Sequence, residues 1–101
     1  LQTDDIARLE RMLSRFGASM DETLAELRQR FSARDAQSLR ASAHAAKGAS
    51  ASVGAIFLST LLKKLECAAM DEDWGRIDAI MPEIETAFAD LKLYLGSVRA
   101  A

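Results

Sequence analysis

One short segment of the chain holds the residues whose types and spacing suggest chemistry. His44 is the only histidine, and Lys47 and Gly48 follow it. A neutral imidazole holds a proton on one ring nitrogen and offers the other as a nucleophile. Residues three and four apart share a helix face, so Lys47 places a cation where an anion on the ring would sit. The segment therefore fits a histidine that receives a phosphoryl group.

Gly48 argues that His44 is more than an ordinary solvated residue. Most lone histidines on a helix surface are simply solvated, and Lys47 alone can be read in the same way. A glycine inside an exposed helix costs stability and fills no packing role, but it clears space beside the imidazole. A metal site is poorly supported, because the chain has no second histidine and no pair of cysteines at ligand spacing.

Four stripes of apolar residues, at spacings of three and four, predict the helices that must position this segment. The first stripe runs from Ile6 and Leu9 to Phe31, and the second consists mostly of small residues that end at Val53. We predict one all-α domain over residues 1–101, an antiparallel up-down-up-down four-helix bundle whose last helix is kinked at Pro82. The helices are expected at roughly 4–32, 35–53, 55–71 and 73–98.

Helix-end signals support these boundaries. Ser32 and Asp35 have the spacing of a capping box, in which Ser32 would cap the second helix. Gly54 is expected to mark the joint to the third helix. With about 100° of rotation per residue, His44 lies roughly 140° from the apolar stripe of the second helix. Arg40 and Lys47 lie roughly 80–100° from that stripe, on the same side, so the ring is expected to face solvent.

Composition limits the classes of function. Half of the 101 residues are hydrophobic and 28% are charged, which suits a single soluble domain with a modest core. The net charge of −2 argues against a nucleic-acid partner. No apolar run is long enough for a membrane span. The single cysteine, Cys67, fits a reducing compartment, so we predict a cytoplasmic protein without membrane contact.

The residues around His44 resemble the histidine-containing phosphotransfer (HPt) domain family. The family motif His-x-x-Lys-Gly-x-Ser-x-x-x-Gly is matched here by His44, Lys47, Gly48, Ser50 and Gly54. The following Gly-Ala…Leu…Leu-Glu run also fits, and the likeness covers nearly the whole chain. Three positions depart from the family pattern and bear on partner choice: Ala46, Ala49 and Phe57.

The resemblance implies a phosphocarrier rather than an enzyme. His44 would take a phosphoryl group from the aspartyl-phosphate of a receiver domain and pass it to the aspartate of another receiver. The receivers would supply Mg²⁺, so this chain itself would bind no cofactor and no metal. Partners would be response-regulator receivers and a hybrid sensor histidine kinase. A monomer is expected, because a two-fold interface over the histidine face would block docking.

Glu66 is the candidate for orienting the imidazole. Antiparallel helices joined near residue 54 bring residue 44 level with residues 63 to 66. Glu66 stands where some family members have a glutamine that hydrogen-bonds the histidine. Two other interpretations stay open: a solvated glutamate, or an ion pair of Glu66 with Lys63 or Arg40.

Several residues are candidates for receiver docking. Lys63 and Arg40 would add a positive rim. Ile56 and Phe57 lie off the third core stripe and suit an apolar contact, although they can equally cap the end of the bundle. The expected docking residues are Arg40, Ala51, Ile56, Phe57 and Lys63.

The sequence also bears on three alternative functions. In the dimerising domain of a histidine autokinase an acidic residue usually follows the histidine, whereas Ala45 follows here. The chain also has no glycine-rich nucleotide loop. The phosphoacceptor domain of a chemotaxis kinase, which an ATP-bound catalytic domain feeds, has a similar motif and stays open. So does a structural helical adaptor with an incidental histidine.

Overall fold

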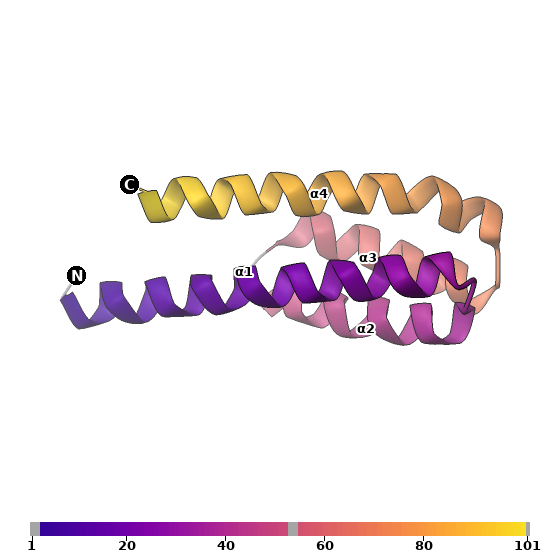
Figure 1. Cartoon of the computed structure of the whole chain (residues 1–101), viewed down its shortest axis with the longest axis horizontal. Coiled ribbons are helices and arrows are strands. Elements are labelled where there is room, and N and C mark those ends of the chain that lie inside the picture. Colours follow the sequence, from indigo (N-terminus) through magenta and orange to yellow (C-terminus); the bar gives the residue numbers. More distant parts are fainter. Residues whose placement is uncertain (1–2, 53–54, 101) are drawn as a thin grey trace.

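The protein is all-helical, and its four helices lie side by side as an elongated bundle (Figure 1). The computed structural model describes residues 3–52 and 55–100, and the side chains of residues 4–52 and 55–96. Its helices are α1 (Thr3–Ser32), α2 (Ala36–Ser52), α3 (Ile56–Met70) and α4 (Trp74–Ala100). These bounds differ by two residues at most from those that the apolar stripes predict. Val53, Gly54 and the side chain of Val98 lie outside this description.

Each helix packs against its neighbours in the chain, and the ring closes between α1 and α4. Short joints force successive helices to run in opposite directions. Both chain ends therefore lie at one end of the bundle (Figure 1). The expected all-α bundle is confirmed. Pro82 lies inside α4, which continues through it, and the kink there stays a prediction.

The joint between α1 and α2 corrects the expected capping box. Ser32 is the last residue of α1 and does not cap α2. Asp35 caps α2 instead: its carboxylate accepts from the backbone N–H of Ser38 at 3.1 Å and from the Ser38 hydroxyl at 2.8 Å. The predicted capping box does not form because the chain reverses its direction at Arg34, whose φ is 54°. This turn places Asp35, rather than Ser32, against the free N–H groups of α2.

The core runs along the inside of the part that all four helices share. Its largest fully buried side chains come from every helix: Leu27, Leu39, Leu62, Leu65, Ile77 and Ile84. The small face of α2 is also buried, through Ala43 and Ala46. Small side chains let neighbouring backbones approach closely, and α2 accordingly packs tightly on α3. This close packing brings the outer face of α2 next to the flank of α3.

The beginning of the first stripe is not core. Ile6 and Leu9 are 45% and 44% exposed, although the stripe continues through them in phase. The reason is that α1 and α4 are longer than α2 and α3, so that their outer ends have only each other to pack against (Figure 1). Within the described residues, none of the helices combines the length and apolar character needed to cross a membrane.

Candidate functional site

The imidazole of His44 projects from the outer face of α2 and is held from α3. Its side chain is 70% exposed. The ring nitrogen Nδ1 lies 2.8 Å from Oε2 of Glu66, whose own side chain is only 15% exposed. Of the interpretations that the sequence left open for Glu66, the structure shows the contact with the histidine. The bundle thus fixes one edge of an otherwise solvent-facing ring.

This contact determines which ring nitrogen is free. A carboxylate only accepts hydrogen bonds, so the proton of the neutral imidazole must sit on Nδ1. Nε2 then carries the lone pair. Because Nδ1 is turned toward α3, Nε2 is the nitrogen on the solvent side of the ring. In its neutral form the ring therefore presents an oriented nucleophilic nitrogen to solvent.

Lys47 completes a trio around the same oxygen. Its Nζ lies 3.2 Å from Oε2 of Glu66, and its side chain is 26% exposed. The backbone carbonyl of Lys47 also accepts a hydrogen bond from the hydroxyl of Ser59 on α3, at 3.4 Å. Lys47 is thus held at the α2–α3 seam, one helical turn after His44. A cation in this place adds positive potential beside the ring.

The trio keeps Glu66 ionised. Burial of the Glu66 carboxyl raises its pKa, but hydrogen bonds from His44 and Lys47, together with the charges of these residues, outweigh burial and lower the pKa below its ordinary value. At neutral pH the carboxylate is therefore charged and accepts from Nδ1–H. A group of this kind can also stabilise a positive charge that develops on the ring.

Gly48 leaves the surface beside His44 open. In the described part of the chain, a Cβ placed on Gly48 would have no other heavy atom within 4 Å apart from its own helix backbone and chain neighbours. The fold itself therefore does not require glycine there. The hydroxyl of Ser52 bonds the Gly48 carbonyl at 3.0 Å, which supports the helix at this point. The other small exposed residues of α2 are Ala41, Ala45, Ala49, Ala51 and Ser52.

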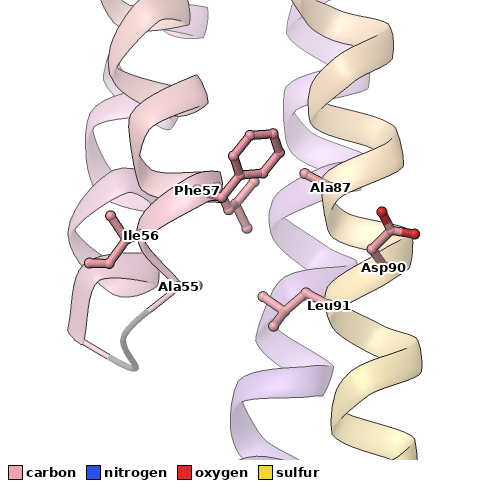
Figure 2. A pocket seen from close by; sticks show the side chains of 7 residues that line it. Ala55, Ile56, Phe57, Ala87, Asp90 and Leu91 are labelled. Carbon is pink, nitrogen blue, oxygen red and sulfur yellow. The ribbon is translucent and has the colours of Figure 1, made fainter.

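The expected docking residues divide between two sides of the molecule. Arg40 and His44 line a shallow hollow of about 370 Å³ on α2, and Ala51 is exposed on the same helix. Ile56, which is 65% exposed, and Lys63 lie on the flank of α3 nearest to α2. Phe57 is 73% exposed but points toward α4, away from this flank (Figure 2). The structure thus brings together four of the five residues.

One exposed residue beside the site was missed from the sequence. Met70 is 54% exposed at the end of α3. Steps of seven residues change direction by only about 20° in a helix, so Ile56, Lys63 and Met70 form one row along the flank of α3. That spacing was the signal that could have revealed Met70. Two apolar side chains thus bracket a lysine next to the Glu66 carboxylate.

Comparison with known proteins agrees with this geometry. A family model, the Hpt domain, matches residues 11–101. The chain belongs to the Hpt domain family. Hpt domains are histidine phosphotransfer modules of two-component phosphorelays, and they interact with receiver domains and kinases. The chain is accordingly a phosphocarrier module of this kind.

A solved structure shares both the fold and part of the sequence of this Hpt domain. It is the histidine-containing phosphotransfer protein B (HptB) from Pseudomonas aeruginosa PAO1, with a TM-score of 0.84 and 30% sequence identity. The match covers 99% of this chain and 94% of that one. No curated protein matches the chain. The likeness extends over all four helices, including the long ends of α1 and α4.

Proposed function

We propose that Nε2 of His44 is the atom that carries the phosphoryl group. The observation that carries this proposal is the contact of Nδ1 with Glu66, because it leaves Nε2 as the free, solvent-facing nitrogen. Nε2 attacks the phosphorus of a receiver's aspartyl-phosphate. The bond from phosphorus to the aspartate oxygen breaks, and the aspartate leaves as a carboxylate. The reverse attack, by the aspartate of another receiver, returns His44 to its free form.

The charge balance of this step assigns a role to Glu66. Nδ1 keeps its proton while Nε2 gains phosphorus, so the ring becomes positively charged. The Glu66 carboxylate, 2.8 Å from Nδ1, faces that developing charge. It orients the ring before transfer and stabilises it afterwards. Glu66 is therefore a positioning residue, since it acts through His44 and does not touch the phosphoryl group.

Lys47 and Gly48 prepare the surface for the incoming phosphate. The Lys47 ammonium lies at the edge of the site and supplies positive charge for the phosphoryl oxygens. Gly48 lets the loops of a receiver come close to the ring. Phosphoryl transfer depends mainly on positioning and on charge stabilisation, and these residues supply both without a metal on this chain. We expect Mg²⁺ in the receiver domain.

The receiver would dock over the adjoining faces of α2 and α3. This surface combines small side chains on α2 with the row of Ile56, Lys63 and Met70 on α3. Arg40 and Lys63 offer positive charge to the acidic pocket of a receiver. We expect this chain to act in a cytoplasmic phosphorelay and to have no ATP-binding machinery of its own.

The test uses a receiver charged with acetyl phosphate and mixed with the wild-type chain or with His44→Gln. We expect labelled phosphate to move to the wild type and not to the variant. The label should survive base and be lost in acid, as a phosphoramidate is. A parallel reaction contains ATP and a chemotaxis-type kinase domain in place of the receiver. Transfer only in that reaction would assign the chain to the kinase-fed class, and transfer in neither would contradict the proposal.

A further inference from the structure

The two long helices leave a step at one end of the bundle. Helix α2 ends at Ser52 and α3 begins at Ile56. Counting back through the antiparallel joints places these ends level with about residue 16 of α1 and about residue 88 of α4. The outer parts of α1 and α4 therefore extend about 20 Å beyond α2 and α3. Figures 1 and 2 both show this paired extension.

On α1, the side that faces α2 continues past the end of α2. Phe16 lies against Ala46 and Ser50 of α2, where the helices line a small shared hollow. Leu9 and Met12 precede Phe16 by seven and four residues, so they lie on the same side of α1. Leu9 is 44% exposed and Met12 is 52% exposed. This side of α1 is thus apolar but lacks the helix that covers it elsewhere.

On α4, the side that faces α3 continues in the same way. Ala87 and Leu91 line a hollow of about 430 Å³ with Ile56 and Phe57 at the start of α3 (Figure 2). Tyr94 follows Leu91 by three residues and lies on the same side, with 64% of its surface exposed. The extension therefore presents one uncovered apolar face, formed by Leu9, Met12, Leu91 and Tyr94. It points to the side that α2 and α3 cover in the rest of the bundle.

We propose that a second copy of this chain covers this face. Two copies would meet head to head around a two-fold axis. The α1–α4 extension of each would take, on the other, the place that α2 and α3 hold along the bundle. The extension has the same length in both copies. The extension of each copy can therefore cover the uncovered face of the other along its whole length. Such a self-complementary contact closes at two copies.

The charges at the two ends of the α1 extension favour this antiparallel arrangement. The charges along the α1 extension are, in order, Asp4, Asp5, Arg8, Glu10, Arg11 and Arg15. When two copies of α1 run antiparallel over this length, Asp4 of one lies level with Arg15 of the other, and Arg8 lies level with Arg11. The charges at the two ends of the extension therefore attract each other in a head-to-head dimer, whereas the arginines between them repel each other and must stay in solvent.

The size of the face predicts a dimer that dissociates on dilution. Two helices about 10 Å apart and about 20 Å long offer a footprint of about 400 Å² on each copy, or about 800 Å² in total, which is below the range of stable interfaces. The dimer also leaves the ring of His44 exposed, although Ala51 and Ile56 lie next to the joint between the two copies. His44 lies eight residues before Ser52, which places it about 12 Å along α2 from the end of that helix. Its side chain faces outward from the side of the bundle. The expectation of a monomer rested on occlusion of His44, and this contact does not cause it.

The experiment is sedimentation velocity over a concentration series from about 5 µM to about 1 mM, with X-ray scattering at the top of the range. We expect a monomer–dimer equilibrium. The dimer should be a rod of about 80 Å, compared with 49 Å for one copy. The double variant Met12→Glu/Tyr94→Glu should remain monomeric throughout. Tyr94→Glu alone should weaken the dimer by about ten-fold or more.

Leu93→Glu is the matched control. Leu93 is 74% exposed and adjoins Tyr94, but it points away from the uncovered face. This variant should dimerise like the wild type. Circular dichroism verifies that every variant is folded. The proposal is overturned by a wild type that stays monomeric at all concentrations, by a dimer that survives the double variant, by equal loss in Leu93→Glu, or by a dimer much shorter than the expected rod.

Discussion

At the scale of single residues, the proposed function depends on one carboxylate, that of Glu66. An exposed imidazole without a partner exchanges its proton between two nitrogens and rotates freely. Oε2 of Glu66 lies 2.8 Å from Nδ1 and 3.2 Å from Nζ of Lys47, and it removes both freedoms while it keeps Nε2 in solvent. The same oxygen holds the cation near the ring. Orientation, tautomer and local charge thus follow from a single side chain on the neighbouring helix.

Substitution of Glu66 tests this role directly. We expect Glu66→Leu to slow phosphotransfer by about ten-fold or more, because the ring loses both its orientation and its counter-charge. Glu66→Gln keeps an oxygen acceptor for Nδ1–H but no charge, and should give an intermediate rate. Rates with a charged receiver give this order.

A second measurement separates positioning from a general structural effect. The chain has one histidine, so ¹⁵N-histidine labelling gives the spectrum of His44 alone. The ¹⁵N shifts should show the proton on Nδ1 in the wild type and in Glu66→Gln, and a mixture of tautomers in Glu66→Leu. Identical ring spectra in all three proteins would refute the assignment.

Gly48 should show a conflict between stability and function. Since a Cβ finds open space there, we expect Gly48→Ala to stabilise the fold by about 0.5–1 kcal/mol in thermal unfolding. Gly48→Gln should reduce transfer by about ten-fold or more, because its side chain keeps the receiver from the ring. Gly17 on α1 also faces open space, and Gly17→Gln is the control that should leave transfer unchanged. Full transfer by Gly48→Gln would remove the clearance role.

At the scale of helices, the ends of the elements are set by polar caps and by two residues in the left-handed region. Asp35 and Asp73 cap α2 and α4 through the backbone N–H groups of Ser38 and Arg76. Arg34 and Glu72 have φ angles of 54° and 51°. Both stand where a helix ends and the chain reverses. These joints fix the register of α2, and therefore the level at which His44 meets α3.

The Asp35 cap should make stability depend on pH. Hydrogen bonds from the backbone and the hydroxyl of Ser38 lower the pKa of Asp35 below its ordinary value. The cap contributes fully above the pKa of Asp35 in the unfolded chain, and its contribution is lost as pH falls through the lower pKa of the folded state. Asp35→Ala should therefore lower the melting temperature at pH 7, and by less in acid.

Asp35→Asn separates the cap from the charge. An amide oxygen also caps but does not titrate, so this variant should stay close to the wild type at pH 7 and lack the acid-dependent term. Melting curves between pH 2 and pH 7 measure the difference. A gap between wild type and Asp35→Ala that is constant over this range would contradict the assignment.

Glu72 marks a site where the fold can be improved. An exposed non-glycine residue in the left-handed region is strained, and glycine is favoured after a helix end. We expect Glu72→Gly to stabilise the protein by up to about 1 kcal/mol in denaturant unfolding. The matched variant Arg34→Gly should give no gain, because Arg34 bonds Asp78 at 2.8 Å and stacks 4.7 Å from the Trp74 ring centre. Equal gains at both positions would show that these Arg34 contacts contribute nothing.

At the scale of the whole molecule, the bundle is a scaffold that separates stability from chemistry. In the described residues the backbone of α4 lies close to α1 and α3 but not to α2. The site therefore lies on the pair α2–α3, and α1 and α4 close the core behind it. Loss of core packing on α4 should reduce the amount of folded protein without changing the folded site.

Ile77 gives the test of this separation. It is fully buried near the start of α4, and Ile77→Ala should cost about 2–5 kcal/mol in denaturant unfolding. Transfer rates, normalised to the folded fraction at low temperature, should match those of the wild type. A slower rate per folded molecule would mean that α4 does influence the geometry of His44.

The sequence by itself determined the four helices, their bounds to within two residues, and the segment that carries the chemistry. It could do so because apolar spacing and a motif on one helix are local properties. The cap of α2 was assigned to the wrong residue, because the chain takes a left-handed turn at Arg34, whose side chain contacts Asp78 and Trp74 of α4. From the sequence alone, contact with His44 was one of several interpretations of Glu66.

Only the tertiary structure decided which side chains meet. The contact of His44 with Glu66 depends on the register of two helices, and a shift of one residue rotates a side chain by about 100°. The exposure of Leu9 and Met12 likewise follows from where α2 ends, although their spacing matches the core stripe or its edge. Local patterns report which side of a helix is apolar. What covers that side depends on the lengths and packing of the other helices, which no single segment encodes.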